Sequence, residues 1–367
     1  MTRLKLDAMP GCDTSKTCWR DATGSIWEEL IVSMPSGSEI QKGAPLYPKT
    51  LAWLALLVIA LQLSGLASAA SYPDRPLQLV VPFPPGGPAG VVADVIAPEL
   101  SQRLGQSVNI EYRNGEDGIV GSNFVAQAPP DGYTLLLASS SHVIHPGTYN
   151  SLPFDTETAF APVSLLLTSQ YLLAVNPSMP IESVEELIAY AKSHPGGLTY
   201  ASGGLGGPTQ LAFELFRLTA GISVSHASYD GGAAALLAVV NGEVQVMMAP
   251  ILAAMPMVAD GRLRALAVSG RHPAPAAPEL PTIAATLPGF SAVSWFGVMA
   301  PAGTPSAVIT RLNQELDRIV HEPETEKRFA AIGGEAVGGP PSTLASLIHE
   351  EIPRWRRVAR EAGIHIE

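Results

Sequence analysis

Residues 77–88, LQLVVPFPPGGP, decide the fold class. The apolar run Leu77–Pro82 predicts a buried strand, and the Pro/Gly turn after it leads into a helical stretch over about 89–104. The same order returns with a second strand at 108–112, a helix at 121–127 and a third strand, YTLLLA, at 133–138. Strands that alternate with helices predict an α/β fold with a parallel sheet covered on both faces.

A second set of alternating segments is nested inside the first. It begins with the long apolar run Val163–Val175, and shorter strands are predicted at about 199–201, 224–227, 244–248 and 263–269. The run Phe296–Ala300 then returns to the first set. We therefore expect two Rossmann-like lobes joined by two crossover strands, with residues 71–170 and 295–367 in lobe 1 and 171–294 in lobe 2. The carboxyl ends of their strands would face one cleft, where open α/β sheets bind ligands.

The N-terminal part of the chain carries an export signal. The stretch Leu51–Leu66 follows two lysines and precedes small residues, which predicts a signal peptide over 49–70 that is cleaved near Ala69 or Ala70 and sends the protein to the periplasm. A retained membrane anchor is the alternative, but the unbroken apolar run is 11 residues, against about 20 needed to span a bilayer. Residues 1–48 are interpreted as a spurious or disordered extension, with translation starting at Met34.

Composition narrows the function classes. Hydrophobic residues make up 47% of the 367 residues, which excludes global disorder, and the net charge of −11 without a basic run argues against nucleic-acid binding. Both cysteines, Cys12 and Cys18, precede the predicted cleavage site, so the mature chain offers no disulfide and no cysteine ligand for a metal. An acidic protein of this kind would bind an anion through local donors.

Three strand-to-helix loops, at 84–90, 139–141 and 202–208, lack bulky charged side chains. Glycine-rich loops at helix N-termini present main-chain N–H groups to an anion, and serine hydroxyls add donors. These loops therefore predict a site for a carboxylate. Each loop taken alone could also be an ordinary tight turn.

Catalytic alternatives find little support in the residue spacing. The serine triplet 139–141 with His142 and His145 invites a serine hydrolase, but the pair has no evident acidic partner and no G-x-S-x-G motif is present. The glycine loops lack nucleotide fingerprints, and the eight histidines lack metal-ligand spacing. We expect no catalytic residue, no metal and no cofactor.

Short sequence motifs along the whole mature chain point to a known family. They are YPDRP at 72–76, VVPFPPGG at 80–87, PDGYTLL at 130–136, YAS at 200–202, Y-x-GGA at 229–233, LRALAV at 263–268, SWFG at 294–297 and APAGTP at 300–305. Together they resemble the Bug family, periplasmic solute receptors of tripartite tricarboxylate transporters. The resemblance covers essentially all of residues 72–367.

The resemblance implies a periplasmic-binding-protein fold of type II whose two lobes close on a small carboxylate held by main-chain groups and ordered waters. Carried over by position, the ligand-binding residues would be Phe83, Pro85, Gly86, Gly87, Ser139, Ser140, Ser141, Ser202, Gly203, Gly204 and Gly231. The implied partners are the large and small membrane subunits of the transporter, with the receptor itself a monomer. A ligand-sensing subunit of a two-component system is the alternative role.

The chain departs from the family pattern at several polar positions. Family members usually carry Asp, Asn, His, a basic residue and Asp where this chain has Gly90, Leu205, Gln210, Asp230 and Ala249. A second carboxylate on the ligand would lack a fixed partner there, and burying an unpaired charge is costly. We therefore expect a monocarboxylate, or a ligand with a neutral or aromatic far end, rather than citrate or succinate.

Overall fold

The computed structural model describes residues 72–366, so the predicted leader and N-terminal extension lie outside the described residues. Within that part, none of the helices combines the length and the apolar character that crossing a membrane requires. The described residues 72–366 all belong to one compact unit. The residue bounds of the two lobes therefore stay a prediction.

The first group of elements follows the expected strand–helix alternation. Five- and six-residue segments form its parallel strands, and its three α-helices have Gly87, Gly118 and Ser140 as N-caps. Its elements are β1 (Leu77–Val81), α2 (Pro88–Leu104), β2 (Val108–Tyr112), the short η1 (Glu116–Gly118), α3 (Ile119–Ala126), β3 (Thr134–Ser139) and α4 (Ser141–Thr148).

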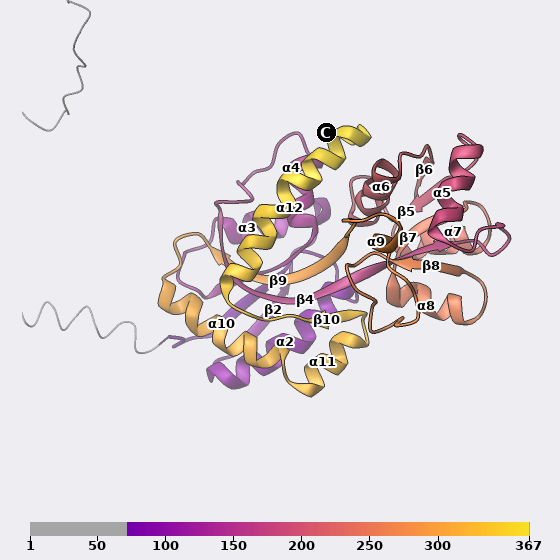
Figure 1. The fold of residues 1–367 in the computed structure, drawn as a ribbon. Coiled ribbons are helices and arrows are strands. Elements are labelled where there is room, and N and C mark those ends of the chain that lie inside the picture. The colour runs from indigo at the N-terminus through magenta and orange to yellow at the C-terminus, as the bar shows by residue number, and fades with distance from the viewer. Residues whose placement is uncertain (1–71, 367) are drawn as a thin grey trace, which may run out of the picture. The chain divides into compact units, whose positions relative to one another are not determined.

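The long strand β4 (Phe160–Val175) leads out of this group and into a second one, as Figure 1 shows. The second group contains α5 (Val184–Ser193), β5 (Thr199–Ser202), α6 (Pro208–Ala220), β6 (Ser225–Ser228), α7 (Gly232–Val240), β7 (Val246–Pro250), α8 (Ile251–Ala259), β8 (Arg264–Val268) and α9 (Ile283–Thr286). The chain then returns through β9 (Val293–Pro301), α10 (Ser306–Val320), α11 (Pro323–Ala330), β10 (Gly334–Ala336) and α12 (Pro341–Ala362).

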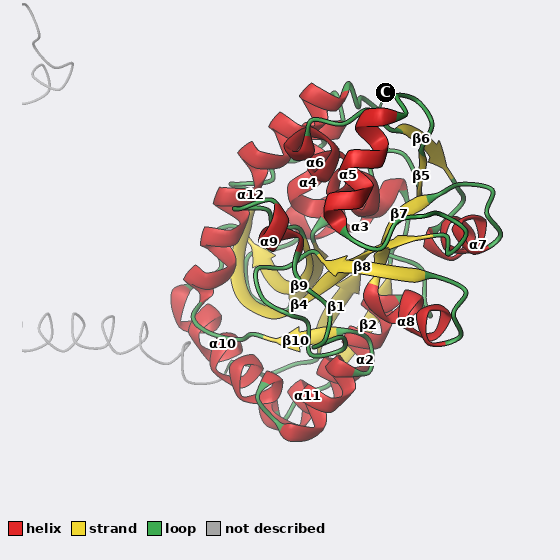
Figure 2. Ribbon diagram, turned by 45° about the vertical axis from the view of Figure 1, so that its right-hand side comes forward, coloured by secondary structure: helices red, strands yellow, loops and turns green. Residues whose placement is uncertain are grey.

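The strands form one mixed sheet in the order β2-β1-β3-β9-β4-β7-β5-β6, with β8 and β10 also paired to β4. Helices cover the sheet on both sides (Figure 2). The residues 160–170 of β4 pair with β9, and the residues 171–175 pair with β7 and β8. This arrangement confirms the predicted α/β class with two crossover strands.

Strand direction decides where the loops lie. Strands β1, β2 and β3 are mutually parallel, and β9 runs antiparallel to both β3 and β4, so β4 runs the same way as the first three. Strand β7 is antiparallel to β4, and β5 and β6 run parallel to β7. Because β4 passes from the first group to the second, the carboxyl ends of β1–β3 point toward the second group. Those of β5–β7 point back toward the first.

The core fills both faces of this sheet. Trp295 on β9 is fully buried, and its indole Nε1 donates to Glu351 Oε2 of α12 at 3.1 Å. Helix α12 thus fixes a crossover strand from outside the sheet. Burial raises the pKa of Glu351, and the indole N–H and Arg354 oppose that rise.

Candidate functional site

The loop after β1 presents the open face of a helix start. Pro84 through Gly86 are exposed, Phe83 is half-buried, and Gly87 is the N-cap of α2 without a side-chain cap. Gly86 has a φ of +83°, which favours glycine, and a Cβ there would meet nothing within 4 Å. The first N–H groups of α2 are therefore without a side-chain acceptor, as an anion site requires.

The serine triplet lies at the junction of β3 and α4 and is buried. Ser139 ends β3, and Ser141 begins α4. The main-chain N–H of Ser140 donates to Trp295 O at 3.1 Å, and its Oγ lies 3.3 Å from Ser294 Oγ. Both partners belong to β9, so Ser140 ties the loop to that crossover strand.

The hydrolase interpretation of this triplet needs one correction. His145 does have an acidic partner, because its Nε2 lies 3.1 Å from Asp117 Oδ2 of η1. The Nε2 of His142 faces Thr156 O at 3.0 Å. Both Nε2 atoms are therefore occupied by groups other than serine. Sequence reasoning missed Asp117 because 28 residues separate the pair.

The loops after β5 and β6 lie against each other. Ser202 ends β5 and is fully buried, and its carbonyl accepts from the N–H of Tyr229 at 2.9 Å. A Cβ at Gly203 would lie 2.7 Å from the main-chain nitrogen of Gly232, so only glycine allows this approach. Gly231 is the N-cap of α7, again without a side-chain cap. The structure thus brings Ser202, Gly203 and Gly231 together.

One contact joins this loop to the first group. A Cβ at Gly206 would lie 3.3 Å from Cβ of Thr148, the last residue of α4, and closer still to the side chain of Ile366. Ile366 in turn donates its N–H to Thr148 O at 2.7 Å. The helix that begins with Ser141 therefore reaches the loop that begins at Ser202.

Sequence reasoning missed two residues that support this loop. His226 on β6 has its Nε2 2.7 Å from Ser202 Oγ, and its Nδ1 is 3.2 Å from Gln210 Nε2 on α6. Gln210 Oε1 accepts the N–H of Gly206 at 2.6 Å. A lone histidine in a short strand carries no sequence signal for such a role.

These bonds fix the proton positions. Because Gln210 Oε1 takes the Gly206 N–H, its NH₂ faces His226 Nδ1, and the histidine proton sits on Nε2. The histidine therefore donates to Ser202, whose hydroxyl donates to Gly204 O at 3.0 Å. A histidine that donates to a serine cannot take its proton, so this pair does not activate a nucleophile.

The loop after β2 belongs to the same edge and was also missed. Glu116 and Asp117 have φ of 48° and 50°, which is a strained conformation for residues with a Cβ. The Asp117–His145 contact connects this loop to α4. A Cβ at Gly118 would lie 3.3 Å from the Phe83 ring, so the loops after β1 and β2 also touch.

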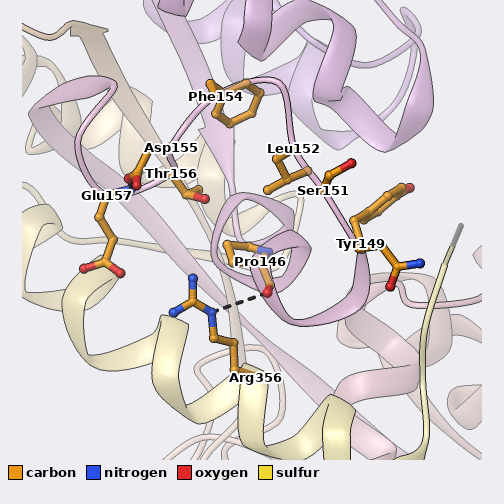
Figure 3. Close-up of a pocket in the computed structure, with 10 residues that line it drawn as sticks. Pro146, Tyr149, Ser151, Leu152, Phe154, Asp155, Thr156, Glu157 and Arg356 are labelled. Atoms are coloured by element: carbon orange, nitrogen blue, oxygen red, sulfur yellow. Dashed lines mark hydrogen bonds between the residues drawn. The ribbon is translucent and has the colours of Figure 1, made fainter. Parts of the chain in front are cut away.

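Figure 3 shows a pocket that lies elsewhere, between the segment 149–157 and α12. Its volume is about 190 Å³. Arg356 reaches into it and donates through Nε to Pro146 O at 3.3 Å, and Asp155 and Glu157 lie across from it. Asp155 accepts the N–H groups of residues 157 and 158, which lower its pKa. Its carboxylate therefore stabilises the turn at residues 155–158.

The positions that depart from the family pattern are spread over different surroundings. Leu205 is 66% exposed at the tip of the 202–208 loop, and Asp230 is also exposed. Ala249 is buried in β7, and a Cβ at Gly90 would lie 3.3 Å from Tyr112 Oη. Within residues 72–366, no three His, Cys, Asp or Glu side chains are grouped closely enough to hold a metal ion.

The chain is similar to a receptor family and to solved binding proteins over most of its length. The matching family model is that of the tripartite tricarboxylate transporter family receptor, over residues 92–364. BugT of Bordetella pertussis is 35% identical over 320 residues, which are 86% of this chain and 98% of BugT. A protein from the tcbD-tcbE intergenic region of Pseudomonas sp. strain P51 is 36% identical over 79% of this chain and 87% of its own length.

Solved structures of binding proteins are also similar to this chain. An R. palustris protein, solved with adipate, is 36% identical with a TM-score of 0.70 and covers 80% of this chain and 100% of its own. MatC from Rhodopseudomonas palustris, with bound malate, is 31% identical with a TM-score of 0.66, over 78% of this chain and 99% of MatC. The periplasmic binding protein BugD is 28% identical with a TM-score of 0.67, over 80% of this chain and 100% of BugD.

Proposed function

Because the chain belongs to the tripartite tricarboxylate transporter receptor family and is a periplasmic solute-binding receptor rather than an enzyme, we propose that it captures a small carboxylate between its two groups of strands. It then delivers the ligand to the membrane subunits of a tripartite transporter. One observation carries the proposal: the N-caps of α2, α6 and α7 are Gly87, Gly207 and Gly231, and none of the three makes a side-chain cap. Each follows a strand whose carboxyl end faces the other group.

Helix starts of this kind suit a carboxylate for a physical reason. The first N–H groups of a helix lack main-chain acceptors, and the helix dipole adds partial positive charge there. Two neighbours, solved with adipate and with malate, support a carboxylate as the ligand class. Both of those ligands carry two carboxylates. The exposed Leu205 and Asp230 favour a ligand whose second end is neutral or apolar in this chain.

A thermal-shift screen of the purified protein against monocarboxylates and dicarboxylates tests the ligand class. A ligand at 100 times its Kd adds about 2.7 kcal/mol to the free energy of unfolding, which shifts the melting temperature measurably. We expect aromatic or amide-bearing monocarboxylates to stabilise the protein more than citrate or succinate. Stabilisation by citrate alone would contradict the ligand class, and no shift with any carboxylate would contradict the function.

The substitution Gly87→Val tests the site. Gly87 has a φ of −85°, and a Cβ there would meet only Pro84 O at 3.8 Å, so the variant can fold while its side chain crowds the start of α2. We expect at least tenfold weaker carboxylate binding by calorimetry. Ser306→Val, at the start of α10 after the antiparallel β9, is the matched control at the opposite edge of the sheet. If Gly87→Val binds the carboxylate as tightly as Ser306→Val does, the loop after β1 is not part of the binding site.

Export and delivery have their own tests. N-terminal sequencing of the periplasmic protein should find Ala70 or Ser71, whereas an intact leader in the membrane fraction would indicate an anchor. Ligand-dependent cross-linking to a large membrane subunit would support transport. Cross-linking to a sensor kinase instead would support the two-component role.

A further inference from the structure

His226 supports the candidate ligand loop 202–208 without being part of it. We infer that His226 is the positioning residue of this loop and that it holds the loop only as a neutral imidazole protonated on Nε2. The inference deepens the proposed function, since it concerns how the same site is kept in shape and how acid would open it.

The imidazole is bonded toward both ends of the loop. Through Nε2 it donates to Ser202 Oγ, which lies at the first residue and itself bonds to Gly204 O. Through Nδ1 it accepts from Gln210, whose Oε1 holds the N–H of the buried Gly206. One ring therefore orders a loop in which Gly204 and Gly206 have positive φ and add no side-chain contacts of their own.

Protonation breaks this arrangement at a definite bond. A second proton on Nδ1 would face the NH₂ group of Gln210, two donors 3.2 Å apart. If the amide turned over to offer its oxygen to Nδ1, it would present NH₂ to the N–H of Gly206. Either way one buried donor loses its acceptor, which is the costly outcome for a hydrogen-bond network.

The groups around the ring favour the neutral form. Tyr200 on β5 stacks on His226 at 4.7 Å between ring centroids. Glu214 on α6 is the carboxylate that favours the charged form of the ring, but Glu214 already accepts from Tyr200 Oη and Arg217 Nε, each at 2.6 Å. Asp230, in the loop after β6, is exposed. Burial lowers the pKa of His226, and Glu214 opposes that shift.

Amide exchange of Gly206 in the ligand-free protein is the primary test. We expect ¹⁵N NMR to show the Nε2–H form of His226 at pH 8, and the Gly206 protection factor to fall at least tenfold as His226 is protonated. In Gln210→Glu, one carboxylate oxygen accepts the Gly206 N–H and the other accepts Nδ1–H. Protection should then persist to lower pH. His194→Gln, at an exposed histidine, is the control and should behave as the wild type.

Two results would overturn the inference. One is an Nδ1–H tautomer at pH 8, and the other is the same pH profile of Gly206 protection in the wild type and Gln210→Glu. Ligand affinity gives an independent readout. Between pH 8 and 5 the affinity should fall at least tenfold further in the wild type than in Gln210→Glu. Because the same ligand is used with both proteins, the titration of its carboxylate affects both affinities equally. If no carboxylate binds at any pH, the proposed function fails, and Gly206 protection still decides the role of His226.

Discussion

The buried imidazole of His142 makes stability depend on pH in a way that can be calculated. The ring is 5% exposed on α4, lies edge-on to Phe160 at 5.2 Å between centroids, and has one polar partner at Nε2, Thr156 O at 3.0 Å. Removal from water disfavours the charged form, and the pKa of His142 falls to about 4 from the ordinary 6.5.

The sign follows from linkage. Between pH 6.5 and 4 the unfolded chain binds a proton on His142 that the folded chain does not bind. The free energy of unfolding therefore falls as the pH falls through this window. Relative to pH 7.5, the loss due to His142 is about 2 kcal/mol at pH 5 and about 3 kcal/mol at pH 4, since one pKa unit corresponds to about 1.4 kcal/mol.

Urea unfolding of the wild type and His142→Gln at pH 7.5, 6, 5 and 4 isolates this effect. The glutamine amide can still donate to Thr156 O and has no charge to acquire. The wild type should lose about 3 kcal/mol more than the variant between pH 7.5 and 4, whatever the other groups contribute to both. Parallel stability curves for the two proteins would refute the assignment of a depressed pKa to His142.

Three further substitutions test local contacts. Gly203→Ala should lower the free energy of unfolding by about 1–3 kcal/mol by denaturant unfolding, because its Cβ would lie 2.7 Å from Gly232 N, whereas Gly232→Ala, with nothing within 4 Å, should not show that clash penalty. Ser183→Ala removes the cap that accepts from Glu186 N at 3.1 Å and should cost about 1 kcal/mol. Leu205→Ala should change stability by less than about 0.5 kcal/mol and still weaken apolar monocarboxylates severalfold by calorimetry; equal affinity would exclude contact.

The parts of the fold that could be predicted from the sequence are those with a strong local pattern. The apolar run 163–175 is long for a single strand, and it lies in the crossover strand β4, which pairs with strands of both groups. The spacing of Ser183 and Glu186 is that of a capping box, and Ser183 Oγ accepts the N–H of Glu186 at the start of α5. Helix α8, ILAAMPMVA, lacks a polar face and contains Pro256, so no helical period marked it.

The candidate site divides in the same way. Its glycines and serines follow predicted strands, and parallel strands gather their loops at one edge, so their neighbourhood could be foreseen. The supporting residues could not. His226 and Gln210 meet across 16 residues, and Asp117 meets His145 across 28, through pairings that only the three-dimensional arrangement of β6, α6, η1 and α4 creates.

The source of the affinity also decides how the site should respond to salt. The chain has net charge −11, so its long-range field opposes a carboxylate, while the proposed donors are helix N–H groups and hydroxyls that act within a few ångströms. Salt at about 0.15 M screens charges beyond about 8 Å and weakens the distant repulsion more than the local attraction. Carboxylate affinity, measured by calorimetry from 20 to 500 mM NaCl, should therefore hold constant or rise. A steep fall would mean that an exposed cation holds the ligand, and the uncapped helix starts would then not be the source of binding.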